Sequence, residues 1–294
     1  MLNEEKLLKS LEGISESEFQ RYMGFIRNHS IKQLQRDGFK ISYYSCGSGE
    51  KAILTFAGGW GPPEIAYDMI LAFEEKNRVV VIDVSPFDNP EDMCRGVDQI
   101  LETENIDRVV LSGQSMSGII AQSYFKRNSD RVIGLVLTNT IAPREERCKK
   151  WVLVLLRVIP LSLLKYFAKK QLRRLGKLEK EIPVDIRERR RFVAALMSTI
   201  MDQYFTKENT MNLLKSAYAF NEKDGYTRSD FEGWQGRALI ITSEDDPYYG
   251  DTEILMQSIP NAELFKFPTG YKHTAPQIHR DEFHSLIQRF IDGL

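Results

Sequence analysis

The sequence has few cysteines and almost no net charge. Its 294 residues include three cysteines, Cys46, Cys94 and Cys148, which lie far apart. A disulfide scaffold or a cysteine-based zinc site uses more cysteines at closer spacing, so the pattern argues against both. Lysine plus arginine (40) balances aspartate plus glutamate (41) to leave a net charge of −1. We therefore do not expect a nucleic-acid partner, which a globally basic chain would suggest.

The sequence also has no hydrophobic run long enough to cross a membrane. Its longest apolar stretch, residues 151–167, is interrupted by Arg157, Pro160 and Lys165, whereas a bilayer-spanning helix needs about 20 apolar residues. The first residues are partly acidic and form no apolar segment of the kind found in secretory signals. We therefore expect a soluble, cytoplasmic protein. Apolar residues make up 42% of the chain, as in an ordinary globular protein.

Short apolar runs alternate along the chain with helical patterns about a dozen residues long. Strands are predicted at residues 39–45, 52–56, 78–82, 108–111, 132–137, 238–241 and 263–267. Helices are predicted between and after them at residues 62–75, 90–103, 116–127, 250–258 and 281–291. Continuous apolar strands joined by helices are typical of a parallel sheet covered on both faces. The predicted fold class is α/β, with a mostly parallel, doubly wound sheet.

Two stretches depart from this alternation. Residues 1–36 have the apolar spacing of two short amphipathic helices, with Ser15 and Glu18 placed to form a capping box at the second. Residues 141–232 contain several helical patterns and no clear strand. The sequence thus predicts a helical N-terminal extension (1–36), an α/β core (37–140 and 233–294) and an all-helical cap inserted into that core (141–232).

The strongest chemical motif lies between the strand predicted at 108–111 and the helix predicted at 116–127. It reads Gly-Gln-Ser-Met-Ser from Gly113 to Ser117. Small residues around Ser115 permit a sharp turn that exposes its hydroxyl at a helix N-terminus, where negative charge is stabilised. The pattern departs from Gly-x-Ser-x-Gly only at Ser117, which is small enough to preserve the turn. Ser115 is therefore the candidate nucleophile, although five-residue patterns of this kind also occur by chance.

A serine hydroxyl becomes a good nucleophile when a base accepts its proton. The chain has four histidines. His29 lies in the N-terminal extension, and His279 and His284 lie on or beside the last helix, where we expect surface positions. His273 follows a predicted strand at the carboxyl edge of the sheet, where active sites of α/β sheets gather, and is the candidate base.

A catalytic histidine also needs a carboxylate that orients its ring. Three acids follow the strand predicted at 238–241. Asp246 is the best placed, Asp245 and Glu244 are alternatives, and a solvated acidic turn without a catalytic role also stays open.

The oxyanion formed during attack needs two N–H donors. The backbone of Met116, directly after the nucleophile, is expected to supply one. The other is expected from Gly59 or Trp60, in the glycine-rich loop that follows the strand at 52–56.

The strand–turn–helix around Ser115 and the order Ser, Asp, His resemble the α/β-hydrolase fold family, over residues 39–140 and 235–294. The family places a cap where residues 141–232 are found. Two residues depart from the family's pattern. Many members have histidine where this chain has Ala57, and histidine or asparagine where it has Gln114. The resemblance implies that Ser115 is the nucleophile, Asp246 the acid and His273 the base. It also implies an oxyanion hole formed by Met116 with Gly59 or Trp60.

These residues predict a serine hydrolase that cleaves a carboxylic ester or thioester through an acyl-enzyme, with no metal or organic cofactor. The substrate is expected to be a small molecule with an acyl or aromatic group. Lactonases, lipases and carbon–carbon bond hydrolases use the same triad within this family, so the motif does not choose among them. The alternative from another class is a ligand-binding sensor on a hydrolase scaffold, with slow or no turnover.

Positive charge is concentrated in the predicted cap. Residues 144–191 contain 16 lysines or arginines and 6 acids, interleaved with apolar and aromatic residues. Two interpretations stay open. The favoured one is that cap helices bury their apolar residues over the pocket and leave a basic face in solvent. The other is that the segment makes peripheral contact with an anionic membrane.

Overall fold

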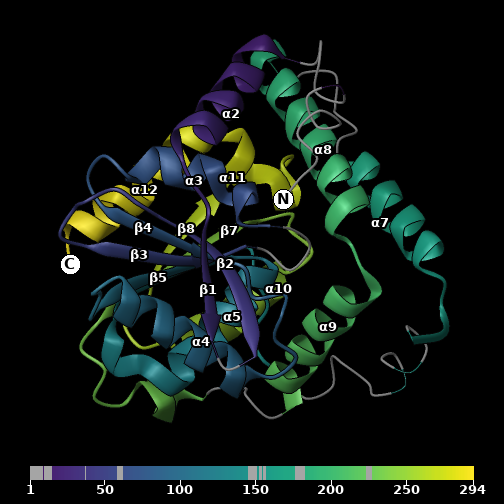
Figure 1. Ribbon diagram of the computed structural model, residues 1–294. Coiled ribbons are helices and arrows are strands. Elements are labelled where there is room, and N and C mark those ends of the chain that lie inside the picture. Colours follow the sequence, from purple (N-terminus) through teal and green to yellow (C-terminus); the bar gives the residue numbers. More distant parts are fainter. Residues whose placement is uncertain are drawn as a thin grey trace.

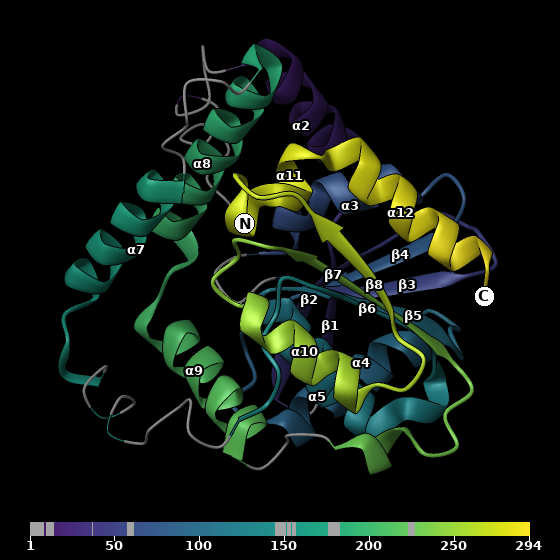
Figure 2. The ribbon, with the colours of Figure 1, turned by 180° about the vertical axis from the view of Figure 1, so that it is seen from behind.

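One sheet of eight strands forms the centre of the molecule, with helices on both faces (Figures 1 and 2). The computed structural model describes residues 9, 15–36, 38–57, 62–144, 151, 154, 157–175, 183–222 and 227–294. In chain order the strands are β1 (Lys32–Arg36), β2 (Phe39–Cys46), β3 (Ala52–Phe56), β4 (Arg78–Ile82), β5 (Val109–Gln114), β6 (Val132–Thr138), β7 (Arg237–Ser243) and β8 (Glu263–Phe267). Their spatial order is β1-β2-β4-β3-β5-β6-β7-β8.

The sheet is parallel from β4 to β8, because β3 pairs in parallel with β4 and β5, and β6, β7 and β8 follow in parallel. Only β1 and β2 run antiparallel to their neighbours. The predicted fold class, a mostly parallel α/β sheet, is therefore confirmed. The carboxyl ends of six strands meet at one edge, where loops carry the polar residues of interest.

Two apolar layers cover the sheet, one on each face. The first contains α4 (Pro90–Thr103), α5 (Met116–Asn128) and α10 (Tyr249–Ser258), and the second contains α2 (Glu16–Asn28), α3 (Tyr67–Phe73) and α12 (Arg280–Asp292). In β4, Val80 and Ile82 face the first layer, whereas Val79 and Val81 face the second. Burial on both faces explains why this strand reads as a continuous apolar run.

One strand falls where the sequence analysis predicts helix. Lys32–Arg36 forms β1, at the edge of the sheet, and pairs with β2 from Lys32 opposite Tyr43 to Arg36 opposite Phe39. Its sequence has a single apolar residue, Leu34, among polar ones. Polar edge strands are common because one side of the strand meets water. The pairing with β2, and not its own pattern, makes this segment a strand.

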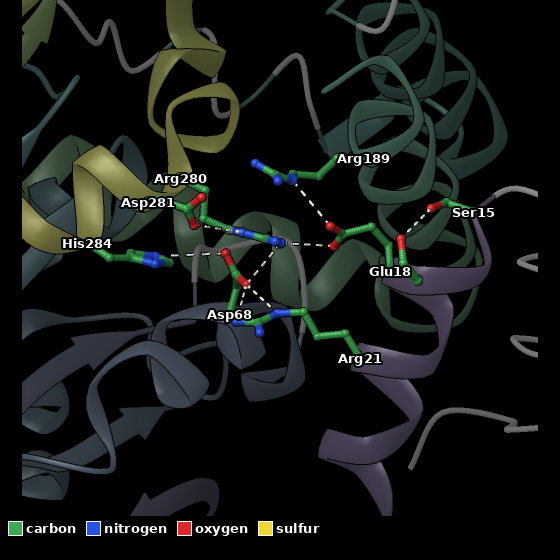
Figure 3. A network of polar contacts seen from close by, with 9 residues as sticks. Ser15, Glu18, Arg21, Asp68, Arg189, Arg280, Asp281 and His284 are labelled. Carbon is green, nitrogen blue, oxygen red and sulfur yellow. Dashed lines mark hydrogen bonds and ion pairs between the residues drawn. The ribbon is translucent and has the colours of Figure 1, made fainter. Parts of the chain in front are cut away.

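The predicted capping box at the start of α2 does not form. Ser15 occupies the N-cap position, but its side chain makes no capping hydrogen bond. The carboxylate of Glu18 instead accepts hydrogen bonds from Arg189 and Arg280, at 3.2 and 3.0 Å (Figure 3). Ion pairs with two arginines outcompete the local cap, which is a tertiary effect that the spacing of Ser15 and Glu18 does not reveal. The other helix predicted in residues 1–36 lies largely outside the described residues.

The described part of residues 141–232 is helical, as predicted. It contains α7 (Leu161–Leu175), α8 (Val184–Tyr204), α9 (Lys207–Glu222) and a short 3-10 turn at Arg228–Phe231. The helices α8 and α9 contact the core, and α7 lies on the outer side of α8 (Figures 1 and 2). Among the described helices, none combines the length and the apolar character that crossing a bilayer requires. The boundaries of the three predicted parts stay a prediction.

A polar network attaches the cap to the core (Figure 3). Glu18 of α2 is 8% exposed and lies between Arg189 of α8 and Arg280 of α12. Arg280 and Arg21 also contact Asp68 of α3, at 3.4 and 3.0 Å. The N-terminal helix thus forms the joint between the cap and the second layer of the core. Below this network, Phe192, Leu196 and Ile200 of α8 pack with the same apolar layer as Tyr22.

A second buried carboxylate organises the antiparallel edge of the sheet. Glu104, directly after α4, is 6% exposed. It accepts hydrogen bonds from Lys32, Tyr43 and Ser45, at 2.9, 2.8 and 2.9 Å, and it pairs with Arg78. Burial alone would raise the pKa of Glu104, but these hydrogen bonds outweigh burial and lower it below its ordinary value of 4.5. The ionised carboxylate therefore stabilises the folded chain.

We predict that Glu104→Ala lowers the free energy of unfolding by about 3 kcal/mol, because it leaves a half-buried arginine without its carboxylate partner and a buried tyrosine without its acceptor. A depressed pKa contributes stability at neutral pH that is lost as pH falls below the unfolded-state value, so the difference from the wild type should shrink in acid. Urea titrations at several pH values measure both effects. Glu102→Ala, at an exposed position of the same helix, is the matched control. Equal losses in the two variants would contradict this role of Glu104.

Candidate active site

The turn between β5 and α5 places Ser115 in a strained backbone conformation. Its φ and ψ are 55° and −120°, in a region that side chains rarely adopt. The flanking chain approaches closely. A Cβ at Gly113 would lie 2.5 Å from the Ser117 carbonyl oxygen, and a Cβ at Gly118 would lie 2.5 Å from the Thr140 hydroxyl. Both positions therefore require glycine, and together they allow the sharp turn expected from the motif.

Ser117, the departure from the Gly-x-Ser-x-Gly pattern, strengthens this turn. Its hydroxyl accepts a hydrogen bond from the Gln114 N–H and donates one to the Gln114 carbonyl, both at 2.8 Å. The side chain is 5% exposed. A glycine at this position could make neither contact, so the serine adds two side-chain hydrogen bonds where it departs from the pattern.

Residues after β6 support the same turn, and sequence reasoning missed them. The Ser115 N–H donates to the Thr138 carbonyl at 3.0 Å, and the Thr140 hydroxyl donates to the Ser115 carbonyl at 2.7 Å. Asn139, with φ of 41°, donates through its amide to the His273 carbonyl at 3.4 Å. The sequence did contain a signal for them, because Thr138, Asn139 and Thr140 are three polar residues directly after the strand predicted at 132–137.

A further contact joins the turn to the region of His273. Gln277 of α11 (Ala275–Ile278) donates to the side chain of Gln114 at 3.1 Å. Gln114 stands where many hydrolases of the resembled family carry histidine or asparagine, and here its side chain links the residue before Ser115 to the helix after His273. The segments that hold the candidate nucleophile and the candidate base are thus adjacent. Among the described contacts, no hydrogen bond joins Ser115 and His273 directly.

The candidate base and acid are in direct contact. Nδ1 of His273 donates to Oδ2 of Asp246 at 2.6 Å, and the other oxygen of Asp246 accepts the Tyr248 N–H at 2.7 Å. The Asp246 side chain is fully buried, whereas that of His273 is 21% exposed. Because Nδ1 carries the proton donated to the carboxylate, neutral His273 keeps its lone pair on Nε2. The ring edge of Tyr248 packs against the imidazole, with centroids 5.5 Å apart.

The two alternative acids lie elsewhere in the same turn. Asp245 accepts the backbone N–H groups of Gly270 and Lys272, at 2.7 and 3.0 Å, and so shapes the loop that carries His273. That loop contains φ values of 102° at Gly270 and 48° at Lys272. Glu244 is exposed. Of the three acids, Asp246 alone contacts the histidine ring among the described contacts.

The expectation that His279 and His284 are surface residues is wrong. The ring of His279 stacks on Phe267 with centroids 5.2 Å apart. His284 is 15% exposed, and its burial lowers its pKa. His279 lies just before α12 and His284 lies on it, and their rings contact Phe267 and Phe73 of the apolar layer that packs α12 on the sheet. Neither contacts Ser115 or Asp246 among the described contacts.

His29 belongs to a separate cluster at the opposite edge of the sheet. Within the described part of the chain, His29, Cys46 and Glu74 bring their side-chain ligand atoms within 4.8 Å of one another. Both ring nitrogens of His29 are already hydrogen-bonded, to the Phe25 carbonyl at 2.9 Å and to Glu74 at 2.7 Å. Burial and the charge of Glu74 raise the pKa of Cys46 to about 11. A protonated thiol is a poor metal ligand, so we assign this cluster to packing.

Of the two segments predicted to supply the oxyanion donors, the structure describes the one that contains Met116. Met116 begins α5, and its N–H forms no hydrogen bond with the described residues, as expected for the first residue of a helix. Gly59 and Trp60 lie outside the described residues. Ala57, just before this loop, donates its N–H to the Ile82 carbonyl at 2.9 Å and is buried. Ala57 thus stays at the carboxyl end of β3, a strand that pairs with β5 on its other side.

Two buried carboxyl groups near this edge were also missed. Asp83 directly follows β4, and Glu64 lies in the short turn Pro63–Ala66. Burial raises the pKa of both. One oxygen of Glu64 has no hydrogen-bond partner among the described residues. Burial and the charge of Glu64 raise the pKa of Tyr204, at the end of α8, to about 12, so these acids lie close to the cap.

An apolar cavity lies beside Met116, between the core and α9. Its lining includes Val84, Met93 and Ile119 from the core and Leu213 and Ala217 from α9. The free volume is about 20 Å³, which is room for one water molecule. Asn212 and Lys215 of α9 hold this side of the cap against the loop after β4, through bonds to Ser85 and Asp88 at 3.2 and 2.8 Å. An acyl group could occupy the cavity only after side chains or α9 move.

Comparisons with known proteins agree with this architecture. No curated protein matches the chain in sequence. Solved structures with a similar fold include the enol-lactonase from Burkholderia xenovorans, with 20% identity, a TM-score of 0.68, and coverage of 89% of this chain and 100% of that chain. A thermophilic esterase from Thermogutta terrifontis is 14% identical, with a TM-score of 0.65 and coverage of 90% of this chain and 98% of that chain. A bacterial membrane phospholipase A is 15% identical, with a TM-score of 0.61 and coverage of 97% of this chain and 92% of that chain.

The family model described as the alpha/beta hydrolase fold matches residues 59–274, which is most of the chain. This range includes Ser115, Asp246 and His273. The matched sequence, the parallel sheet and the similar structures agree, and the chain belongs to the α/β-hydrolase fold family.

Proposed function

We propose that this hydrolase is a serine esterase that acts on a carboxylic ester or thioester. The observation that carries the proposal is the 2.6 Å hydrogen bond from His273 to the fully buried Asp246, next to the segment that holds Ser115. A buried carboxylate bonded to Nδ1 fixes the imidazole tautomer that a general base needs. Ser115 stands at the N-terminus of α5 with positive φ, as the nucleophile of such a site does.

The mechanism follows from these positions. Ser115 attacks the substrate carbonyl carbon while Nε2 of His273 accepts the hydroxyl proton. Asp246 stays ionised and stabilises the imidazolium, and the Met116 N–H stabilises the oxyanion. The proton then passes from His273 to the leaving alcohol or thiol, which departs and leaves an acyl group on Ser115. His273 next activates a water molecule that releases the acid.

One observation favours an ester with an apolar acyl group. The cavity beside Met116 is lined mainly by apolar side chains. The similar structures include an enol-lactonase, an esterase and a phospholipase A. Their low identity supports the fold alone, so the acyl preference rests on the cavity. A cytoplasmic location stays a prediction.

We predict that Ser115→Ala and His273→Ala each lower the kcat for p-nitrophenyl butyrate by at least about 10³-fold, because each removes one part of a single catalytic unit. Asp246→Asn should cost a similar factor, since it disturbs the tautomer of His273. Glu244→Gln, an exposed change in the same turn, is the control and should keep wild-type turnover. Undiminished esterase activity in Ser115→Ala would refute the proposal. Slow, single-turnover release by the wild type would instead favour the ligand-binding sensor.

The cavity gives a prediction about acyl-chain length. Ala217→Leu fills the space between α9 and Met116, so kcat/KM for p-nitrophenyl hexanoate should fall about 10-fold while the value for the acetate stays unchanged. Ala219→Leu adds the same atoms on the same helix, outside the cavity lining, and is the matched control. If Ala217→Leu changes kcat/KM for the hexanoate no more than Ala219→Leu does, the acyl chain does not occupy this cavity.

A further inference from the structure

Exposed apolar side chains gather on one part of the cap. Of the nine large hydrophobic residues that are exposed in the described part of the chain, six lie between residues 151 and 167. Soluble proteins seldom gather large apolar side chains on one exposed surface without a binding role. We call this surface the cap patch. Its members and their exposed fractions are Trp151 (61%), Val154 (60%), Val158 (72%), Leu163 (42%), Tyr166 (56%) and Phe167 (55%).

The spacing of these residues places them on helix faces. Trp151, Val154 and Val158 are each helical and lie three and then four positions apart, and in α7 Tyr166 and Phe167 lie three and four positions after Leu163. Positions three or four apart share one face of an α-helix. The rings of Tyr166 and Phe167 contact each other edge to face, with centroids 5.6 Å apart. Each helical segment therefore presents an apolar stripe to solvent.

This exposure bears on the two interpretations of the basic cap segment. The favoured interpretation, in which apolar residues are buried over the pocket, is wrong for the cap patch. In Figures 1 and 2, α7 lies on the outer side of α8, away from the sheet. The inner helices α8 and α9 bury their apolar residues against the core, with Phe192 and Phe220 fully buried. The outer helix α7 packs on α8 and is not among the described helices that contact the core.

The charged residues within the segment that carries the cap patch have one sign. Residues 151–175 contain six lysines or arginines and no acid. Arg157 and Lys170 are exposed, whereas Lys169 pairs with Asp202 of α8 at 2.5 Å. A second copy of this chain would bring the same positive charges together, which disfavours a symmetric contact. An anionic surface would instead be attracted to them.

We propose that the cap patch docks on the surface of an anionic lipid bilayer. The apolar side chains of the cap patch enter the boundary between head groups and acyl chains, and the neighbouring Arg157 and Lys170 lie near the lipid phosphates. Aromatic residues such as Trp151 and Tyr166 are suited to that boundary, because their rings are apolar and their edges polar. The proposal does not depend on the esterase activity.

The test is flotation of the full-length protein with vesicles of phosphatidylcholine alone or of an equimolar mixture with phosphatidylglycerol. We expect binding to the anionic vesicles that weakens as salt is added. Arg157→Glu with Lys170→Glu should weaken binding at least about 10-fold, since the change replaces two exposed basic residues near the anionic surface with acids. Tyr166→Ser with Phe167→Ser should weaken it by a similar factor.

Val184→Ser and Leu264→Ser remove exposed apolar side chains outside the cap patch and are the matched controls. They should bind vesicles as the wild type does. Thermal melts of all variants separate loss of binding from loss of folding. Tryptophan fluorescence gives an independent readout, because insertion of Trp151 should shift its emission to the blue, and Trp151→Phe should abolish the shift.

Three outcomes would overturn the proposal. The first is no binding to anionic vesicles at low salt. The second is equal binding by the wild type and the Tyr166→Ser, Phe167→Ser variant, which would leave the apolar face without a role. The third is that neither protein binds vesicles, and that sedimentation velocity shows a dimer for the wild type and a monomer for this variant. A second copy of the chain would then occupy the cap patch.

Discussion

The close approach of β5, α5 and the end of β6 is the constraint on which the rest of this site depends. Gly113 and Gly118 have no room for a Cβ, and Ser115 between them adopts a positive φ. Asn139 and Lys272, near the same site, also have positive φ. Such conformations cost about 1–3 kcal/mol each and persist where neighbouring contacts hold them. Here those contacts come from Ser117, Thr140 and Asp245.

Much of this architecture could be predicted from the sequence, because buried parallel strands and the Ser115 turn have strong local patterns. The strands at 52–56, 78–82 and 263–267 agree with the observed bounds. The chain order of Ser115, Asp246 and His273 also led to residues that the fold brings to one edge of the sheet. The role of these residues in catalysis stays a prediction.

What could not be predicted depends on contacts between distant segments. β1 is a strand because β2 pairs with it, and its own sequence is too polar to indicate one. Glu18 leaves its local cap because Arg189 and Arg280 lie nearby in the folded chain. His279 and His284 are packed because the folded chain brings Phe267 and Phe73 against their rings. The exposure of the cap patch likewise depends on how α7 packs on α8.

The most direct test of the account is whether Ser115 is an activated nucleophile. The purified protein is treated with a fluorophosphonate, and the adduct is located by intact mass and peptide mapping, alongside Ser115→Ala and His273→Ala. The account predicts one adduct on Ser115 in the wild type, none in Ser115→Ala and far slower labelling in His273→Ala. Absence of labelling in the folded wild type, or labelling that does not depend on His273, would contradict it.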